Sequence, residues 1–209
     1  MQKLIEGIHK FRQVELGKYQ KLFHRLSQEG QNPHTLFITC CDSRVLAEFI
    51  TQSRPGDLFV VKNVGNIIPP SDLSCNPNST GAAIEFAIQT LNVQDVVVCG
   101  HSFCGAMQSL LAGFDDVKMP HLSQWLNLAL PVKQLIENKY TYLTDENERA
   151  AAAAEENVLF GLENLCTYPF VAERLKQGTL RLHAWFFKIE TAEMFAYDPV
   201  SQQFQIIKN

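Results

Sequence analysis

The segment DVVVCGHSFC, residues 95–104, joins a short apolar run to residues that can carry chemistry. A run of this length between polar residues predicts a strand buried on both faces of a parallel sheet. The segment TLFITCCDSR, residues 35–44, has the same design, and DLFVVK, residues 57–62, predicts a third strand between the two. These repeated buried strands predict an α/β sheet with polar groups at the carboxyl ends of the strands.

Helical patterns lie between and after these strands. Residues 81–91 repeat apolar side chains at helical spacing, and residues 121–138 do the same, with a kink or break expected at Pro131. Residues 146–165 contain five consecutive alanines, the residue type with the best helix propensity. Strands alternating with helices favour right-handed crossovers in one sheet.

The two ends of the chain complete the expected fold. Residues 1–30 are amphipathic and predict a helical arm, whereas residues 180–189 and 193–197 predict a closing hairpin of late edge strands. Residues 63–80, with several prolines, are expected to form a loop. We therefore expect an α/β fold with a mostly parallel central β-sheet flanked by helices. The arm, residues 1–30, belongs to the same domain as the α/β unit of residues 31–209.

Composition narrows the function classes. Eighteen basic and 22 acidic residues give a formal net charge of −4, without a long run of either sign, so we expect no nucleic-acid or anionic membrane partner. No segment approaches the roughly 20 apolar residues of a membrane helix, and no signal-peptide pattern is present, which predicts a cytoplasmic protein with a small-molecule substrate. The six cysteines are expected to be reduced thiols: Cys40, Cys41, Cys75, Cys99, Cys104 and Cys166.

A nucleophilic serine is one interpretation of residues 100–104. The sequence Gly-His-Ser-Phe-Cys resembles the Gly-x-Ser-x-Gly elbow of hydrolases, but Cys104 replaces the second glycine. A triad would pair Ser102 with His183 and with Asp145 or Asp198. Asp198 follows His183, against the usual order, and His183 lies in an apolar strand, where we expect a hydrogen-bonded core histidine. This hypothesis also leaves the polar end of the first strand without a role.

A metal site is the second interpretation, and it uses residues at the ends of both predicted strands, in the segments 35–44 and 95–104. His101 and Cys104 are one helical turn apart, and Cys40 ends the neighbouring predicted strand, so the three can converge where parallel strands terminate. Thiolate and imidazole are preferred zinc ligands, and three of them leave a fourth position open for catalysis. Asp42 could accept a proton from a metal-bound water, held by Arg44 in a two-point pair. Capping of a helix start is the structural alternative for this segment.

The combined pattern resembles the β-class carbonic anhydrases over nearly the whole chain. The signature pieces are Cys40-x-Asp42-Ser43-Arg44 and Gly100-His101-Ser102-x-Cys104-Gly105, with supporting stretches at 59–66, 81–87 and 183–185. The segments MQKLIEGIHKFR and GNIIPP are most similar to the cyanobacterial enzymes associated with carboxysomes. The resemblance thus implies a cytoplasmic enzyme, with carboxysomes as its expected compartment and carboxysome proteins as expected partners.

The resemblance implies the reaction and its cofactor. One Zn²⁺ per chain would be held by Cys40, His101 and Cys104, and Asp42 with Arg44 would form the catalytic dyad. The reaction would be reversible hydration of carbon dioxide to bicarbonate and a proton through zinc-bound hydroxide. In an inactive state of some relatives, Asp42 takes the fourth position on zinc. The alternative function is a catalytically silent zinc-containing scaffold or regulatory protein with this fold.

The resemblance also implies a substrate pocket and an oligomer. Gln31 matches a substrate-binding glutamine that a partner subunit contributes, so a homodimer or higher homo-oligomer is expected. Phe59, Val64 and Phe86 match positions that line the apolar pocket, and Phe86 stands where relatives commonly have tyrosine. Lys62 replaces a common arginine, which keeps the charge without the planar fork.

Two further departures concern regulation and packing. Phe37 stands where the bicarbonate-inhibited branch has tryptophan, so that allosteric site is not expected here. Ala184 and Ala192 replace frequent glycines near the last strands, which affects local packing more than chemistry. Each of these substitutions leaves the zinc ligands and the dyad unchanged.

Overall fold

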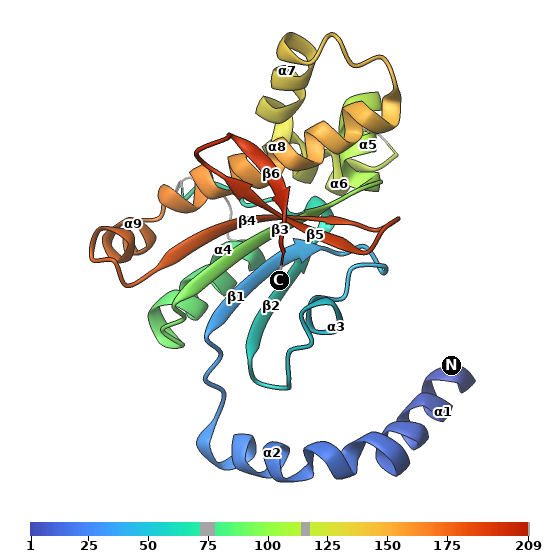
Figure 1. Ribbon diagram of the computed structural model, residues 1–209, viewed down its shortest axis with the longest axis vertical. Coiled ribbons are helices and arrows are strands. Elements are labelled where there is room, and N and C mark those ends of the chain that lie inside the picture. Colours follow the sequence, from blue (N-terminus) through green and yellow to red (C-terminus); the bar gives the residue numbers. More distant parts are fainter. Residues whose placement is uncertain (72–77, 114–117, 209) are drawn as a thin grey trace.

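A computed structural model describes residues 1–71, 78–113 and 118–208 of the chain (Figure 1). Its helices and strands alternate through the first half of the chain, and the last strands follow one another directly. The helices are α1 (Gln2–Lys10), α2 (Leu16–Glu29), α3 (Ala47–Thr51), α4 (Ser79–Glu85), α5 (Gly105–Ala112), α6 (Pro120–Leu126), α7 (Leu130–Lys139), α8 (Glu146–Cys166) and α9 (Pro169–Lys176). The strands are β1 (Thr35–Cys40), β2 (Leu58–Asn63), β3 (Asp95–His101), β4 (Arg181–Lys188), β5 (Glu193–Asp198) and β6 (Gln203–Ile206).

The strands form one mixed sheet in the order β2-β1-β3-β4-β5-β6. The pairs β1–β2, β1–β3 and β3–β4 are parallel, whereas β5 and β6 are added antiparallel at one edge. Cys40 pairs with Asn63, and Thr39 pairs with Cys99, two residues before His101. The mostly parallel sheet with late edge strands is therefore confirmed, and the two motif-bearing strands end side by side.

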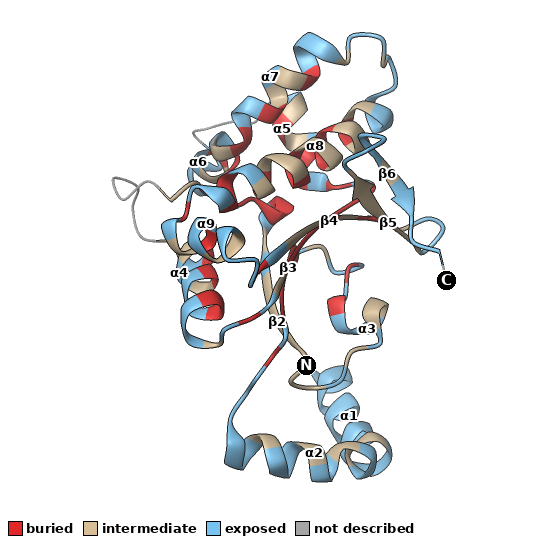
Figure 2. Cartoon of the chain, turned by 60° about the vertical axis from the view of Figure 1, so that its left-hand side comes forward, coloured by how far each residue is buried: buried red, intermediate tan, exposed pale blue. Residues whose placement is uncertain are grey.

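Helices cover the two faces of the sheet unequally. Helices α4, α8 and α9 lie on one side, where they bury the main hydrophobic core, whereas the short helix α3 lies on the other (Figure 2). Helix α8 packs directly along β3: a Cβ at Gly100 would lie only 2.7 Å from Val158 Cγ2. Only glycine permits this approach, which places the end of β3 beneath α8.

Local signals explain where the long helix starts. The side chain of Asp145 accepts hydrogen bonds from the backbone amides of Asn147 and Glu148, at 2.9 and 3.0 Å, and so caps α8. The break expected at Pro131 is confirmed, because α6 ends at Leu126 and Pro131 lies in the first turn of α7.

Among the helices of the described residues, none is both long enough and apolar enough to cross a membrane.

The predicted N-terminal arm consists of α1 and α2, joined through a π-helical segment, Phe11–Glu15. It projects away from the sheet, and its residues are exposed or of intermediate burial (Figures 1 and 2). Helix α2 ends at Gly30, whose φ of 81° lies in the left-handed region. None of the residues of α1 and α2 is buried. Leu26, near the end of α2, lies against Gly56, whereas most apolar side chains of the arm are exposed.

Several predicted boundaries were incomplete. The helix expected over 81–91 begins at Ser79 and continues as a π-helical segment, Phe86–Thr90. Strand β6 and helix α9 were not predicted. Strand β6 is short and half polar, and Phe204 contributes its ring contact with Phe186. Cys75 and Pro77 lie outside the described residues, and the described cysteines are free thiols, as expected: Cys40, Cys41, Cys99, Cys104 and Cys166.

Candidate metal centre

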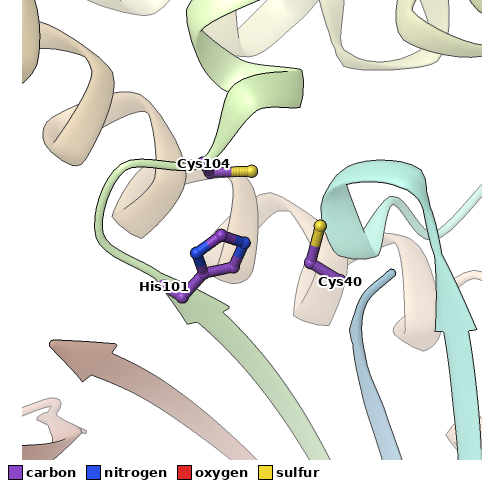
Figure 3. Close-up of side chains that lie close together, drawn as sticks. All are labelled: Cys40, His101 and Cys104. Carbon is purple, nitrogen blue, oxygen red and sulfur yellow. The ribbon is translucent and has the colours of Figure 1, made fainter. Parts of the chain in front are cut away.

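Three side chains converge at the carboxyl end of the sheet (Figure 3). Cys40 is the last residue of β1, His101 is the last residue of β3, and Cys104 immediately precedes α5. Their candidate ligand atoms all lie within 4.8 Å of one another, and the three side chains are buried. Two thiols and one imidazole at this spacing have the composition and geometry of a three-ligand zinc site.

A strained turn brings His101 and Cys104 together. Phe103, between them, has φ of 54°, a left-handed conformation that is unfavourable for a bulky residue. The amide of Ser102 donates to the carbonyl of Phe187 at 3.0 Å, which ties the turn to the end of β4. The strained backbone therefore directs an imidazole and a thiol toward the same point.

The imidazole of His101 is prepared to bind a cation. Its Nδ1 lies 2.8 Å from the carbonyl oxygen of Ser102, and because a carbonyl only accepts, Nδ1 must carry the proton. In the neutral imidazole, Nε2 then carries the lone pair. The Nε2 atom is buried and has no hydrogen-bond partner among the described residues. An unpaired buried nitrogen is costly, and a metal ion at this position would satisfy it.

The two thiols interact directly. A hydrogen bond from Cys104 lowers the pKa of Cys40, assisted by His101 and by backbone groups of Asp42 and Gly65. The bond to Cys40, together with burial, raises the pKa of Cys104. A cation bound at this position would hold both residues as thiolates.

Asp42 and Arg44 form a two-point pair beside this cluster. Arg44 Nε donates to Asp42 Oδ1 at 2.9 Å and Nη2 donates to Oδ2 at 2.7 Å, while Nη2 also donates to the carbonyl of Phe103 at 3.1 Å. The Arg44 guanidinium holds the pKa of Asp42 well below its usual range. Asp42 Oδ2 lies 3.9 Å from His101 Nε2, so an ionised carboxylate faces the position where the three ligands converge.

Lys62 holds the loop that carries Asp42 through two backbone carbonyls. Lys62 Nζ donates to the carbonyl oxygens of Asp42 and Val45, at 3.1 and 2.7 Å. The side chain of Asp42 also accepts from the backbone amide of Arg44 at 2.9 Å, which is a local turn contact. Helix α3 begins only at Ala47 and has no side-chain cap, so the helix-capping alternative for this segment is wrong. Asp42 therefore has the turn contact and the arginine pair at once.

The hydroxyl of Ser102 is engaged in hydrogen bonds to the turn that follows β4. Its hydroxyl donates to Glu190 Oε2 at 2.6 Å and accepts from the amide of Ile189 at 2.9 Å. His183 lies near the opposite end of the sheet, where it is hydrogen-bonded to Asp95 at 2.8 Å. The serine triad is therefore wrong. The expectation that His183 is hydrogen-bonded is confirmed, but its side chain is 38% exposed rather than in the core, because that end of the sheet face is uncovered.

The expected pocket residues separate into two groups. Val64 follows Asn63, the pairing partner of Cys40, and therefore lies beside the cluster. Phe59 pairs with Leu36, four positions from the Cys40 end of β1, which corresponds to about 13 Å along the strand. Phe86 contacts Phe59, with ring centroids 5.9 Å apart, so both rings lie away from their own chain's cluster.

Gln31 belongs to the same distant group. It lies in the exposed segment between α2 and β1, before the strand whose far end carries Cys40. The five residue steps of β1 alone span roughly 16 Å. The structure thus brings together the three candidate metal ligands and the Asp42–Arg44 pair, but not Gln31, Phe59 and Phe86 of the same chain.

One contact of the cluster was not anticipated. The amide of Gly65 donates to Cys40 Sγ at 3.3 Å. Gly65 has φ of 76°, and a Cβ there would lie 2.9 Å from the Cβ of Ala106, so a side chain would collide with α5. The sequence shows Gly65 soon after the strand predicted at residues 57–62. Its contact with the Cys40 sulfur depends on the register between β1 and β2, which the sequence does not give.

Comparisons with known proteins agree with this geometry. The carbonic anhydrase family model matches residues 35–194. A carbonic anhydrase of Synechocystis sp. is 44% identical over 205 residues, which cover 98% of this chain and 73% of that protein. The solved structure of the β-carbonic anhydrase CcaA has a TM-score of 0.94 at 43% identity, with 99% of each chain covered. The chain belongs to the β-carbonic anhydrase family.

Membership in the β-carbonic anhydrase family assigns an activity to this arrangement. Reversible hydration of carbon dioxide is the reaction of the family, and the Cys40, His101 and Cys104 cluster fits the zinc site that this reaction requires. A tetrameric β-carbonic anhydrase from Sordaria macrospora is 30% identical, with a TM-score of 0.83 and coverage of 93% of this chain and 95% of that chain. The protein is therefore a carbonic anhydrase, with a cyanobacterial relative among those most similar to it.

Proposed function

We propose that Cys40, His101 and Cys104 bind one Zn²⁺ per chain and that Asp42 and Arg44 are the catalytic dyad beside it. The observation that supports this assignment most strongly is His101 Nε2. It is buried within 4.8 Å of two sulfurs and has no hydrogen-bond partner in the described part of the chain. When bound, zinc would acidify a water molecule and supply a nucleophile near neutral pH.

Asp42 orients the reaction in this proposal. Its carboxylate accepts a hydrogen bond from the attacking water and directs an oxygen lone pair toward carbon dioxide. Arg44 keeps both carboxylate oxygens in place, which holds Asp42 as a hydrogen-bond acceptor beside the cluster. In the inactive alternative, Arg44 would release Asp42 and the carboxylate would become an additional ligand of bound zinc. Structures determined at low and high pH would distinguish the two states.

The proposed substrate pocket requires two chains. Val64 would contribute one apolar wall in its own chain, whereas Gln31, Phe59 and Phe86 would reach the site of a partner subunit. Apolar walls suit carbon dioxide, which carries no charge to bind. Phe86 is 42% exposed and Gln31 is exposed in a single chain, so both are accessible to a second copy.

Two unpartnered apolar surfaces support a homodimer as the smallest assembly. The arm exposes large apolar side chains: Leu4, Ile5, Ile8, Phe11, Val14 and Phe23. The sheet face opposite α8 has a groove of about 190 Å³ lined by Phe37, Val97 and Trp185, among others. A row of exposed large apolar side chains and an apolar groove are each typical of an interface. We propose that the arm of one chain covers this face of another.

Removing the arm tests the assembly. We expect deletion of residues 1–29 to yield a monomer by light scattering, with carbon dioxide hydration reduced about 10²-fold because the partner's pocket residues are lost. Zinc content should stay near one per chain, since all three ligands come from one chain. Ile8→Asp should weaken the dimer and the matched Lys10→Asp should not. A fully active monomer would contradict the shared pocket.

The pH dependence of the rate tests the nucleophile. Two thiolates cancel more of the zinc charge than neutral imidazoles do, so its water should be less acidified than the value near 7 of a three-histidine site. We therefore expect stopped-flow hydration rates to rise from pH 7 to pH 9. Asp42 does not cause this rise, because Arg44 keeps its pKa far below that range. A rate that falls steadily from pH 7 to pH 9 would contradict this account.

We further propose that the protein is cytoplasmic and associates with carboxysome proteins. The similarity of the chain to a cyanobacterial carbonic anhydrase supports this location. Co-sedimentation with purified carboxysomes, measured against a soluble cytoplasmic marker, tests it.

A further inference from the structure

The loop after β2 is attached to the elements around it through its backbone carbonyls. Side chains donate to five of the six carbonyl oxygens between residues 64 and 69. The donors are Trp125 Nε1 to Val64 at 2.7 Å, Asn157 Nδ2 to Gly65 at 2.9 Å, Asn63 Nδ2 to Ile67 at 2.9 Å, Asn164 Nδ2 to Ile68 at 2.8 Å and Tyr168 Oη to Pro69 at 2.9 Å.

Two of these bonds hold the peptides on either side of Gly65. The carbonyl of Val64 and the amide of Gly65 belong to one peptide unit, so Trp125 donates to the same unit whose N–H donates to Cys40 Sγ. Asn157, from α8, donates to the next peptide through the Gly65 carbonyl. Because glycine has wide conformational freedom, both peptide planes need external contacts to stay in place.

The first of these contacts also affects the strength of the bond to sulfur. A donor on a peptide carbonyl polarises the peptide, so its N–H becomes a better donor, as in other hydrogen-bonded chains. The chain here runs from the indole of Trp125 through the Val64–Gly65 peptide to Cys40 Sγ, with donor–acceptor distances of 2.7 and 3.3 Å. An N–H bond to a thiolate fixes its orientation and withdraws part of its charge.

We propose that Trp125 is a positioning residue for the Cys40 thiolate, acting through the Val64–Gly65 peptide, with Asn157 holding the peptide that follows. The inference rests on the proposed zinc site. Trp125 does not act on the reacting atoms. Its indole lies on α6, and the bond to Val64 connects this helix to the metal centre. Contacts that orient metal ligands typically change metal affinity 10–100-fold when removed.

Tyr168 provides a matched control. Its hydroxyl donates to the Pro69 carbonyl of the same loop, five residues beyond Val64 and away from the peptide that contacts sulfur. Trp125→Phe and Tyr168→Phe each remove one aromatic donor from one loop carbonyl. A general effect on loop packing should appear in both variants, whereas an effect on Cys40 should appear only in Trp125→Phe.

The experiment measures metal binding, independently of activity. Zinc dissociation constants are determined for full-length wild type and both variants by competition with a chromophoric chelator, and the cobalt-substituted proteins are compared by their thiolate-to-metal charge-transfer bands. We expect zinc to bind about tenfold more weakly to Trp125→Phe, with a shifted band. We expect Tyr168→Phe to stay within about twofold of wild type, with an unshifted band.

Asn157→Ser gives a second measurement if Trp125→Phe fails to fold. It removes the amide on the other side of Gly65, and its control is Asn164→Ser, which removes the bond to Ile68 from the same helix. Equal zinc constants and bands for each variant and its control would overturn the inference. Wild type that takes up no cobalt through thiolates would instead overturn the zinc site itself.

Discussion

Asp42→Ala is expected to abolish carbon dioxide hydration while zinc stays bound. The carboxylate lies next to the ligand cluster, paired at two points with Arg44, but the three ligand atoms come from other residues. Removing a positioned acid–base group typically costs 10²- to 10⁴-fold in rate. Stopped-flow hydration measures the loss, and elemental analysis measures zinc.

Asp42→Asn serves as the matched variant for this prediction. The amide keeps the size of the side chain but loses the charge that Arg44 holds, so its rate should fall nearly as far as that of Asp42→Ala. Ser43→Ala, one residue along the same loop, should retain most of the activity. A zinc-replete Asp42→Ala protein with the wild-type rate would remove Asp42 from the dyad. A zinc-replete wild type without activity would support the silent scaffold.

Cys104→Ala is expected to lose both zinc and activity. It removes one of three ligands from the buried cluster, and a chelator applied to wild type should produce the same loss. Cys99→Ala is the control: Cys99 is fully buried and lies two residues before His101. Burial raises the pKa of Cys99 to about 12, so it stays a neutral thiol in the core.

The expected difference between these cysteine variants is large. Cys99→Ala should retain about one zinc per chain, whereas Cys104→Ala should retain almost none after dialysis. Retention of full zinc content by Cys104→Ala would contradict the proposed ligand set.

Ser102→Ala should cost less activity than His101→Ala. The Ser102 hydroxyl contacts Glu190 and Ile189, and the Ser102 carbonyl remains available to His101 in the variant.

The sequence predicted the features that depend on local pattern. Short apolar runs identified β1, β2 and β3, and the shared carboxyl ends of parallel strands implied that Cys40, His101 and Cys104 would meet. The structure brings these residues together. The helix break near Pro131 was equally local, because proline cannot continue a hydrogen-bonded helix.

Contacts between distant segments were not predictable from these patterns. Glu190 lies 88 residues from its partner Ser102, and Gly65 reaches Cys40 only through the register of β1 against β2. His183 has the apolar neighbours of a core residue, yet its face of the sheet is uncovered at that end. Strand β6 has two apolar residues in four and depends on packing against β5.

The sequence by itself predicted the candidate ligand types, the Asp42–Arg44 pair and the strand ends that carry them, because residue identity and periodicity are local properties. Only the tertiary structure decided that Phe59 pairs with Leu36, four residues before Cys40, and that Phe86 packs against Phe59 there. It also decided that the Val64–Gly65 peptide joins Trp125 to a sulfur. Such facts depend on strand register and helix packing, which arise when segments far apart in the chain exclude water together.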